Sequence, residues 1–69
     1  MKPIVELVWD DHAFSPEGEG TIKQRSVGFL VRKTKKIVVI AQTYEKGNRG
    51  YLDKLTVDRR MVRKMTTLR

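Results

Sequence analysis

The sequence lacks cysteine altogether, and it has only one histidine and two prolines in 69 residues. Without cysteine the chain forms no disulfide and no thiolate metal site. A single histidine builds no zinc site without several carboxylates, so we expect neither a metal nor another cofactor. No apolar run approaches the roughly 18 residues of a membrane span, and we expect no membrane partner. The first nine residues are interrupted by Glu6 and do not resemble a signal peptide.

Few residues are available for a hydrophobic core. A chain of this length is one domain at most, here 1–69, and it buries only about 60% of its unfolded surface. Natural chains of this size rely on disulfides, metals or oligomerisation for additional stability. Because the composition argues against the first two, we expect a homo-oligomer.

Acidic residues are scarce outside the first part of the chain. Residues 1–20 carry one lysine and five acids, whereas 21–44 carry six basic residues and no acid, and 45–69 carry eight basic residues and three acids. The formal net charge is +7. Such an asymmetry indicates an anionic partner that meets the later two thirds of the chain, although many small proteins are simply basic.

Short alternating apolar patterns predict an all-β protein. Five strands are expected, at 3–9, 21–32, 37–44, 51–57 and 61–68. A long acidic loop with Gly and Pro is expected at 10–20, and a single short turn at 58–60. A short basic helix over 58–69 is the alternative for the last segment, because Met61, Met65 and Leu68 have helical spacing, but Thr66 and Thr67 favour a strand.

The predicted strands differ in how much of each face is apolar. In the first strand Val5, Leu7 and Trp9 share the buried face. In the second, Val27 shares a face with Phe29 and Val31, and Gly28 marks a bulge, a sharp bend or a close backbone approach. The strand 37–44 is apolar on both faces, so we expect a neighbouring subunit to cover one of them in a homodimer or larger ring. A strongly bent second strand allows the sheet to close into a small barrel.

Four segments carry a resemblance to a known class of proteins. They are Trp9-Asp10, "SVGFLV" at 26–31, "IVVIAQ" at 37–42, and 55–62 with its "LT" start and Val62 end. They resemble SH3-like and Sm-like barrels and, over nearly the whole chain, a group of small bacteriophage proteins. The match is one of apolar positions and includes no catalytic signature. One departure is Asp58, where the group often has proline.

The resemblance implies a fold and a setting. The fold is a five-stranded SH3/Sm-like barrel, with a long acidic loop after the first strand and a 3-10 turn before the fifth. The setting is the cytosol of a host bacterium. Two uses are known for such proteins: sequestering the nucleotide signals of antiphage defence, as the phage sponge proteins do, and binding RNA or single-stranded DNA.

The stretch "VWDDHAFS" at 8–15 holds acids, the histidine and a serine in one place. A catalytic triad needs its three groups to converge from different elements, and one loop provides no such scaffold. A metal there would need further ligands. We therefore expect a strand end in which Trp9 packs over the barrel, Asp10 accepts local backbone hydrogen bonds and His12 is solvated. The protein is not expected to be an enzyme, and no catalytic or metal-binding residue is predicted.

Basic and aromatic residues are the candidates for ligand binding. Arginine and lysine neutralise phosphates, and aromatic rings stack on bases. The predicted ligand-binding residues are Trp9, Lys23, Arg25, Tyr44, Lys46, Asn48, Arg49, Tyr51, Arg59 and Arg60. The alternative for the hairpin at 45–50 is a solvated turn whose two tyrosines pack on the barrel. The lysines of "KTKK" at 33–36 fit an ordinary solvated turn.

The favoured function is therefore non-enzymatic capture of a small phosphate-bearing nucleotide. The alternative is binding of RNA or single-stranded DNA by the same residues on an open surface. A third possibility is a structural or host-protein-binding module, which the acidic loop would suit.

Overall fold

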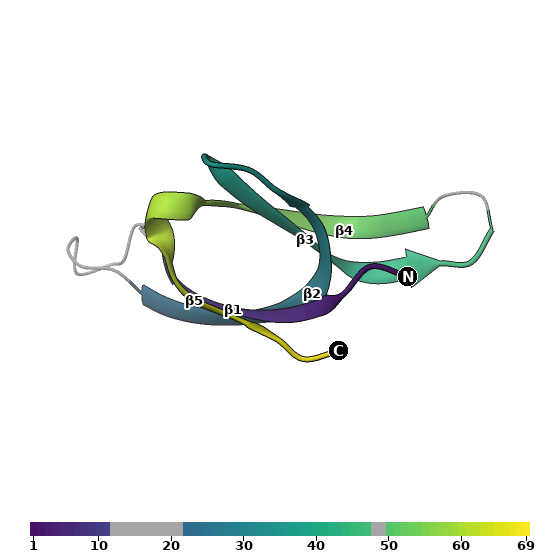
Figure 1. Cartoon of the computed structure of the whole chain (residues 1–69), viewed down its shortest axis with the longest axis horizontal. Helices are drawn as coiled ribbons and strands as arrows, with labels where there is room; N and C mark the ends of the chain where they lie inside the picture. Colours follow the sequence, from purple (N-terminus) through teal and green to yellow (C-terminus); the bar gives the residue numbers. More distant parts are fainter. Residues whose placement is uncertain (12–21, 48–49) are drawn as a thin grey trace.

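The computed structural model describes residues 1–11, 22–47 and 50–69, and its elements are five strands and one short 3-10 helix. They are β1 (Ile4–Asp11), β2 (Ile22–Lys33), β3 (Ile37–Glu45), β4 (Gly50–Asp58), η1 (Arg59–Met61) and β5 (Val62–Thr67). All pairings are antiparallel, in the order β4-β3-β2-β1-β5 (Figure 1). The all-β prediction is confirmed, and the helical alternative for the last segment is wrong.

The core lies on the inner face of a strongly curved sheet. Its fully buried side chains come from three strands: Val5 and Leu7 of β1, Val38 and Ile40 of β3, and Val57 of β4. Partly buried residues pack against it, namely Trp9, Leu30, Leu55, Met61, Val62 and Met65. All five strands and η1 thus contribute, and Figure 1 shows β1 and β5 lying across from β3 and β4. The predicted burial of Val5, Leu7 and Trp9 on one face is confirmed.

The bend in β2 is made possible by Gly28. A Cβ atom at this position would lie 2.6 Å from the carbonyl oxygen of Ala41 in the neighbouring strand. No side chain fits such a close backbone approach, so glycine is required here. A register shift follows between Leu30 and Arg32, where β2 pairs with β3. The bend at Gly28 and this register shift together redirect β2, so that its first part pairs with β1 and its later part pairs with β3.

Strand β3 is buried on both faces within a single chain. Val38, Val39, Ile40 and Ala41 are all buried, and Val39 on the outer face is only 8% exposed. The prediction of a doubly buried strand is confirmed for these four residues. Its corollary, that a second subunit must cover one face, does not hold for Val39, because the chain itself covers that side chain.

Several predicted boundaries and faces need correction. Asp10 and Asp11 were expected in the loop, but they end β1, where they lie opposite Lys23 and Ile22. The remainder of the predicted acidic loop lies outside the described residues. Val27, which the sequence places on one face of its strand with Phe29, lies opposite Glu6 on the outer face and is 47% exposed.

The sheet has two edges, β4 and β5. In the described part of the chain no pairing joins them, so hydrogen bonds do not close the sheet into a barrel. The β4 edge is also irregular, because Asp53 has a φ of 56° and its carboxylate Oδ2 accepts a hydrogen bond of 2.9 Å from the hydroxyl of Thr43. This irregularity interrupts the alternation that the sequence predicts for 51–57.

Candidate phosphate-binding site

Two turns that are distant in sequence meet at one end of the molecule. The first joins β2 to β3, and the second is η1. The backbone N–H of Arg59 donates to the carbonyl of Lys36 at 2.9 Å, and its guanidinium Nη1 donates to the carbonyl of Thr34 at 3.0 Å. Arg59 therefore fixes η1 against the β2–β3 turn through both its backbone and its side chain.

Thr34 gives the β2–β3 turn its shape. Its hydroxyl oxygen accepts hydrogen bonds from the backbone N–H groups of Lys36 at 3.1 Å and Ile37 at 3.0 Å. Its own backbone N–H donates to the carbonyl of Ile37 at 2.9 Å. A threonine that bonds to the backbone two and three residues ahead stabilises a tight turn, and this turn directs Lys35 and Lys36 to the surface.

Asp58 caps η1 and holds Arg60. Its Oδ1 accepts hydrogen bonds from the backbone N–H of Arg60 at 2.9 Å and from the Nε of Arg60 at 3.2 Å. Its Oδ2 accepts a third from Nη2 at 2.9 Å. These bonds hold the pKa of the Asp58 carboxyl below its ordinary value and raise the pKa of Arg60. The pair is therefore fully charged near neutral pH, and it orients the Arg60 guanidinium.

A shallow hollow of about 310 Å³ lies between these elements. It is lined by Lys35, Lys36, Asp58 and Arg60, which we call the basic turn cluster. Both lysines are exposed, and neither pairs with a carboxylate of the described residues. Three cations around one hollow neutralise a phosphate well, and the arginine still has N–H groups that Asp58 does not use.

The basic turn cluster has groups of the kind that recognise a phosphate, namely cations and N–H donors. Hydrogen bonds fix the backbone of its two turns and hold the Arg60 guanidinium. Over residues 1–11, 22–47 and 50–69, no three His, Asp or Glu side chains gather as a metal site. No helix in these ranges has the length and apolarity to cross a membrane.

Comparisons with known proteins identify no relative. No family model, curated protein or solved structure matches the chain.

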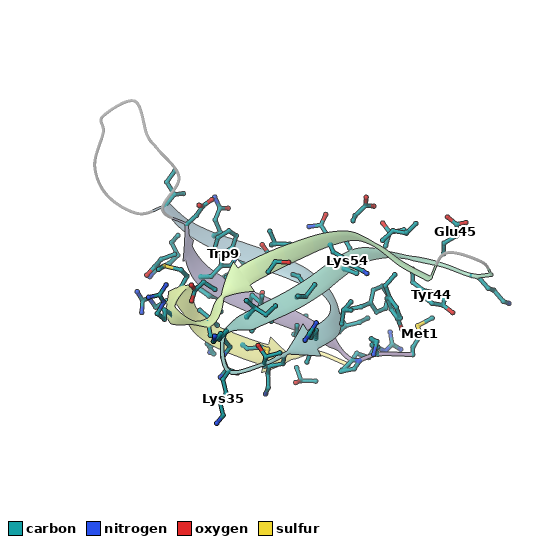
Figure 2. All side chains as sticks on the ribbon, turned by 90° about the horizontal axis from the view of Figure 1, so that it is seen from above. Met1, Trp9, Lys35, Tyr44, Glu45 and Lys54 are labelled. Atoms are coloured by element: carbon teal, nitrogen blue, oxygen red, sulfur yellow. The ribbon has the colours of Figure 1, made fainter. Side chains whose placement is uncertain are left out.

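Of the eight predicted ligand-binding residues that the structure describes, only Arg59 and Arg60 lie beside the lysines of the turn, and they differ in role. Arg60 lines the hollow, whereas Arg59 is engaged with the turn backbone. Trp9 packs against the core, and its Nε1 donates to the hydroxyl of Ser26 at 3.1 Å. The predicted packing of Trp9 is thus confirmed, and part of its ring is already engaged in contacts within the fold. Figure 2 shows Trp9 and Lys35 toward the same end.

The two tyrosines lie far from the cluster. Tyr44 and Tyr51 pack against each other with ring centroids 4.8 Å apart, and both contact Phe29. The Tyr51 hydroxyl also accepts a hydrogen bond of 2.9 Å from the backbone N–H of Lys2. Figure 2 shows Lys35 and Tyr44 at opposite ends of the molecule. The seven steps along the chain from Ile37 to Tyr44 span about 23 Å at the rise of a strand, so one small nucleotide does not reach both sites.

The other predicted residues do not join the cluster either. Lys23 and Arg25 are on the outer face of β2, where Lys23 lies opposite Asp10 and Arg25 Nε is 3.8 Å from a Glu6 carboxylate oxygen. Lys46 is exposed at the β3–β4 hairpin. Asn48 and Arg49 lie outside the described residues. Asp10, expected to accept local backbone bonds, instead pairs with the guanidinium of Arg63 on β5.

Sequence reasoning missed Lys35, Lys36 and Asp58 as site residues. The lysines fit an ordinary solvated turn, and it is the pairing of β3 with β4, with Ile37 opposite Asp58, that places them beside η1. One signal was present: an Asp directly before two arginines is typical of a capped turn that presents cations. That signal identifies one half of the cluster but not its partner.

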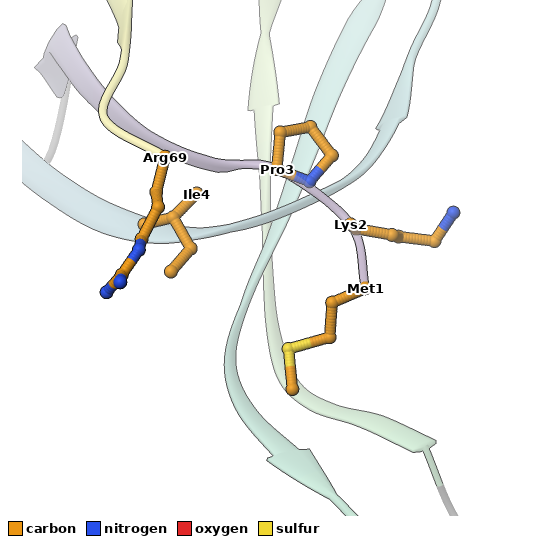
Figure 3. A pocket seen from close by; sticks show the side chains of 5 residues that line it. All are labelled: Met1, Lys2, Pro3, Ile4 and Arg69. Carbon is orange, nitrogen blue, oxygen red and sulfur yellow. The ribbon is translucent and has the colours of Figure 1, made fainter.

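A second hollow, of about 400 Å³, lies beside the N- and C-terminal residues (Figure 3). The apolar side chains of Met1, Pro3 and Ile4 line it together with the cations Lys2 and Arg69. Ile4 and Arg69 are joined there by a backbone hydrogen bond of 3.0 Å. Unlike the basic turn cluster, this hollow has no carboxylate side chain among its lining residues.

Proposed function

We propose that the protein binds a small phosphate-bearing nucleotide at the basic turn cluster and holds it without chemical conversion. The observation that carries this proposal is the convergence of Lys35, Lys36 and Arg60 from two turns that hydrogen bonds fix together. Preorganised cations bind a phosphate at low entropic cost, because the turns from which their side chains extend are already in place. A hollow of this size suits a single small ligand.

The biological setting of the proposal comes from the sequence resemblance. We infer that the curved sheet is a small SH3/Sm-like barrel, and the strand order, the Gly28 bend and η1 support this. In a phage-type protein of this kind, capture of a nucleotide signal in the host bacterial cytosol would act against antiphage defence. Stoichiometric binding is sufficient for that role.

Single-stranded nucleic acid is the second candidate ligand, and one observation favours it. Exposed cations extend beyond the cluster, at Arg32, Lys33, Lys54 and Lys64, on a chain with a net charge of +7. Cations spread over a surface suit a polyanion better than a small ligand. The concave cluster favours the small ligand, and the salt dependence of binding separates the two.

A nuclear magnetic resonance titration with adenosine 3′-monophosphate tests the proposed site. We expect the largest shifts in the backbone amides of 34–37 and 59–61. The double variant Lys35→Gln/Lys36→Gln should lose most of the affinity. The control Lys2→Gln/Lys54→Gln removes the same charge elsewhere and should retain it. Equal loss in both variants, or shifts centred on Tyr44 and Tyr51, would place the ligand elsewhere.

A further inference from the structure

Asp58 stands out because a carboxylate opposes phosphate binding. It is the one acid among the described residues that line the basic turn cluster. Its role as cap of η1 explains its contact with the backbone of Arg60, but serine would cap equally well and would not place a negative charge beside the hollow. The charge of Asp58 orients the Arg60 guanidinium, and it also leaves a carboxylate acceptor beside the hollow.

The hydrogen bonds of Asp58 leave one acceptor position open. Each carboxylate oxygen accepts about two hydrogen bonds. Oδ1 already accepts two from Arg60, whereas Oδ2 accepts only the one from Nη2. The side chain is 42% exposed, so a ligand group has access to it. Oδ2 is thus a fixed and partly used acceptor at the edge of a cationic hollow.

Asp58 is ionised near neutral pH, because the hydrogen bonds from Arg60 hold its pKa below the ordinary value. An ionised carboxylate only accepts hydrogen bonds. It repels a phosphate oxygen and attracts a hydroxyl or amine. A ligand that satisfies the whole cluster must therefore place a phosphate against the lysines and a hydrogen-bond donor directly beside that phosphate.

We propose that Asp58 selects phosphate ligands that carry a free hydroxyl next to the phosphate, as in ribonucleotides with a 3′-phosphate and a free 2′-hydroxyl. In such a nucleotide the two groups are on adjacent ribose carbons, whereas the amines of the base are farther away. This inference rests on the proposed function and adds the ligand class. The lysines and Arg60 bind the phosphate, and Asp58 distinguishes ribose from deoxyribose.

Calorimetry with adenosine 3′-monophosphate and its 2′-deoxy analogue tests the inference. The wild-type chain should prefer the ribonucleotide by roughly tenfold, the effect of one hydrogen bond to a charged group. In Asp58→Asn the amide keeps an acceptor for Arg60 and presents N–H groups in place of Oδ2. The preference should fall to about one, and the deoxynucleotide should bind more tightly than it does to the wild type, because a repulsive charge is gone.

A second variant keeps the test independent of damage to η1. Asp58→Ser retains a capping hydroxyl and lacks the second acceptor, so it should also lose the preference while its circular dichroism stays that of the wild type. An unchanged preference in both folded variants contradicts the inference. If the wild type binds both nucleotides equally, the selection by Asp58 fails and the proposed function stands. If it binds neither, the proposed function fails and this inference fails with it.

Discussion

The residue on which the fold depends most is Gly28, because it permits two backbones to approach each other. The sequence predicts a bend at this position, but it does not identify the partner. The structure shows that the partner is the carbonyl of Ala41, which would lie 2.6 Å from any added Cβ. A backbone carbonyl cannot rotate out of the way as a side chain can. The clash is therefore relieved only by shifting β2 or β3.

We therefore expect Gly28→Ala to destabilise the fold by about 1–3 kcal/mol, the usual cost of overpacking a tight site. The measurement is the urea midpoint of unfolding. Val27→Thr is the matched control, since it changes the adjacent, 47% exposed position and keeps a β-branched side chain. It should stay within roughly 0.5 kcal/mol of the wild type. Equal stability of Gly28→Ala and wild type would show that the two strands are farther apart than described.

Single residues also show the limits of prediction from sequence. The inward positions Val5 and Leu7 follow from the alternation of apolar residues, because a strand has only two faces. The inward position opposite Val5 is Gly28, so the apolar Val27 faces outward. Apolar composition alone does not reveal this, because the strand pairing decides which face of β2 is buried.

At the scale of elements, the proposed binding site depends on one contact, between the β2–β3 turn and η1. Each turn is predictable from its own residues: "KTKK" from its polarity and 58–60 from its acid and arginines. Their contact follows from the pairing of β3 with β4, in which Ile37 lies opposite Asp58, and neither turn alone reveals it. This is why the basic residues at η1 were identified while Lys35 and Lys36 were assigned to an ordinary turn.

Thr34 tests how far binding depends on the turn. In Thr34→Val the backbone N–H groups of Lys36 and Ile37 lose their shared acceptor, and we expect about 1 kcal/mol of destabilisation. Binding of adenosine 3′-monophosphate should weaken by about fivefold if a similar free energy is lost in positioning the two lysines. Thermal melting and calorimetry provide the two readouts.

Thr34→Ser is the control for this prediction, because it retains the hydroxyl and removes only a methyl group. It should bind nearly as well as the wild type. A Thr34→Val variant that melts lower but binds normally would show that the turn contributes to stability and has no role in positioning the lysines.

At the scale of the whole molecule, the sequence predicts the number of strands and the order of the elements correctly. The structure also shows that the sheet ends in two edge strands, β4 and β5, that do not pair with each other in the described part of the chain. Edge strands with unpaired backbone groups are available for pairing with another chain. The two apolar faces of β3 are a weaker reason to expect a homo-oligomer, since the chain itself buries Val39. The edges β4 and β5 now provide the better reason to expect assembly.

Sedimentation equilibrium at micromolar concentration measures the assembly directly. We expect a mass of at least twice the 8.0 kDa of one chain. Lys64→Glu, a charge reversal at an exposed position of β5, tests whether that edge is involved, and Lys23→Glu on the outer face of β2 is its control. A mass of one chain over the whole concentration range would contradict the prediction of a homo-oligomer.

The distance between the basic turn cluster and the tyrosines also concerns the whole molecule, and a different cation, Lys2, has its Nζ 6.0 Å from the centroid of the Tyr51 ring. The sequence suggests a single site in which cations hold phosphates and tyrosines stack on a base. The structure places Tyr44 and Lys35 at opposite ends, and the tyrosines pack with Phe29. The two tyrosine rings contact each other and Phe29, and Tyr44 is still 38% exposed. Phosphate recognition remains as the feature that the geometry supports.

The measurement that tests this account most directly is the salt dependence of ligand affinity. Binding along a single strand releases counterions, and log affinity falls by about 0.7 per log unit of salt for each phosphate contacted. We predict a shallow slope for adenosine 3′-monophosphate, which offers one phosphate to the cluster, and affinity for oligonucleotides that does not increase with length. No binding of the nucleotide, together with steep salt dependence and tight binding of a strand of about 12 nucleotides, would contradict the account and identify the protein as a single-strand binder.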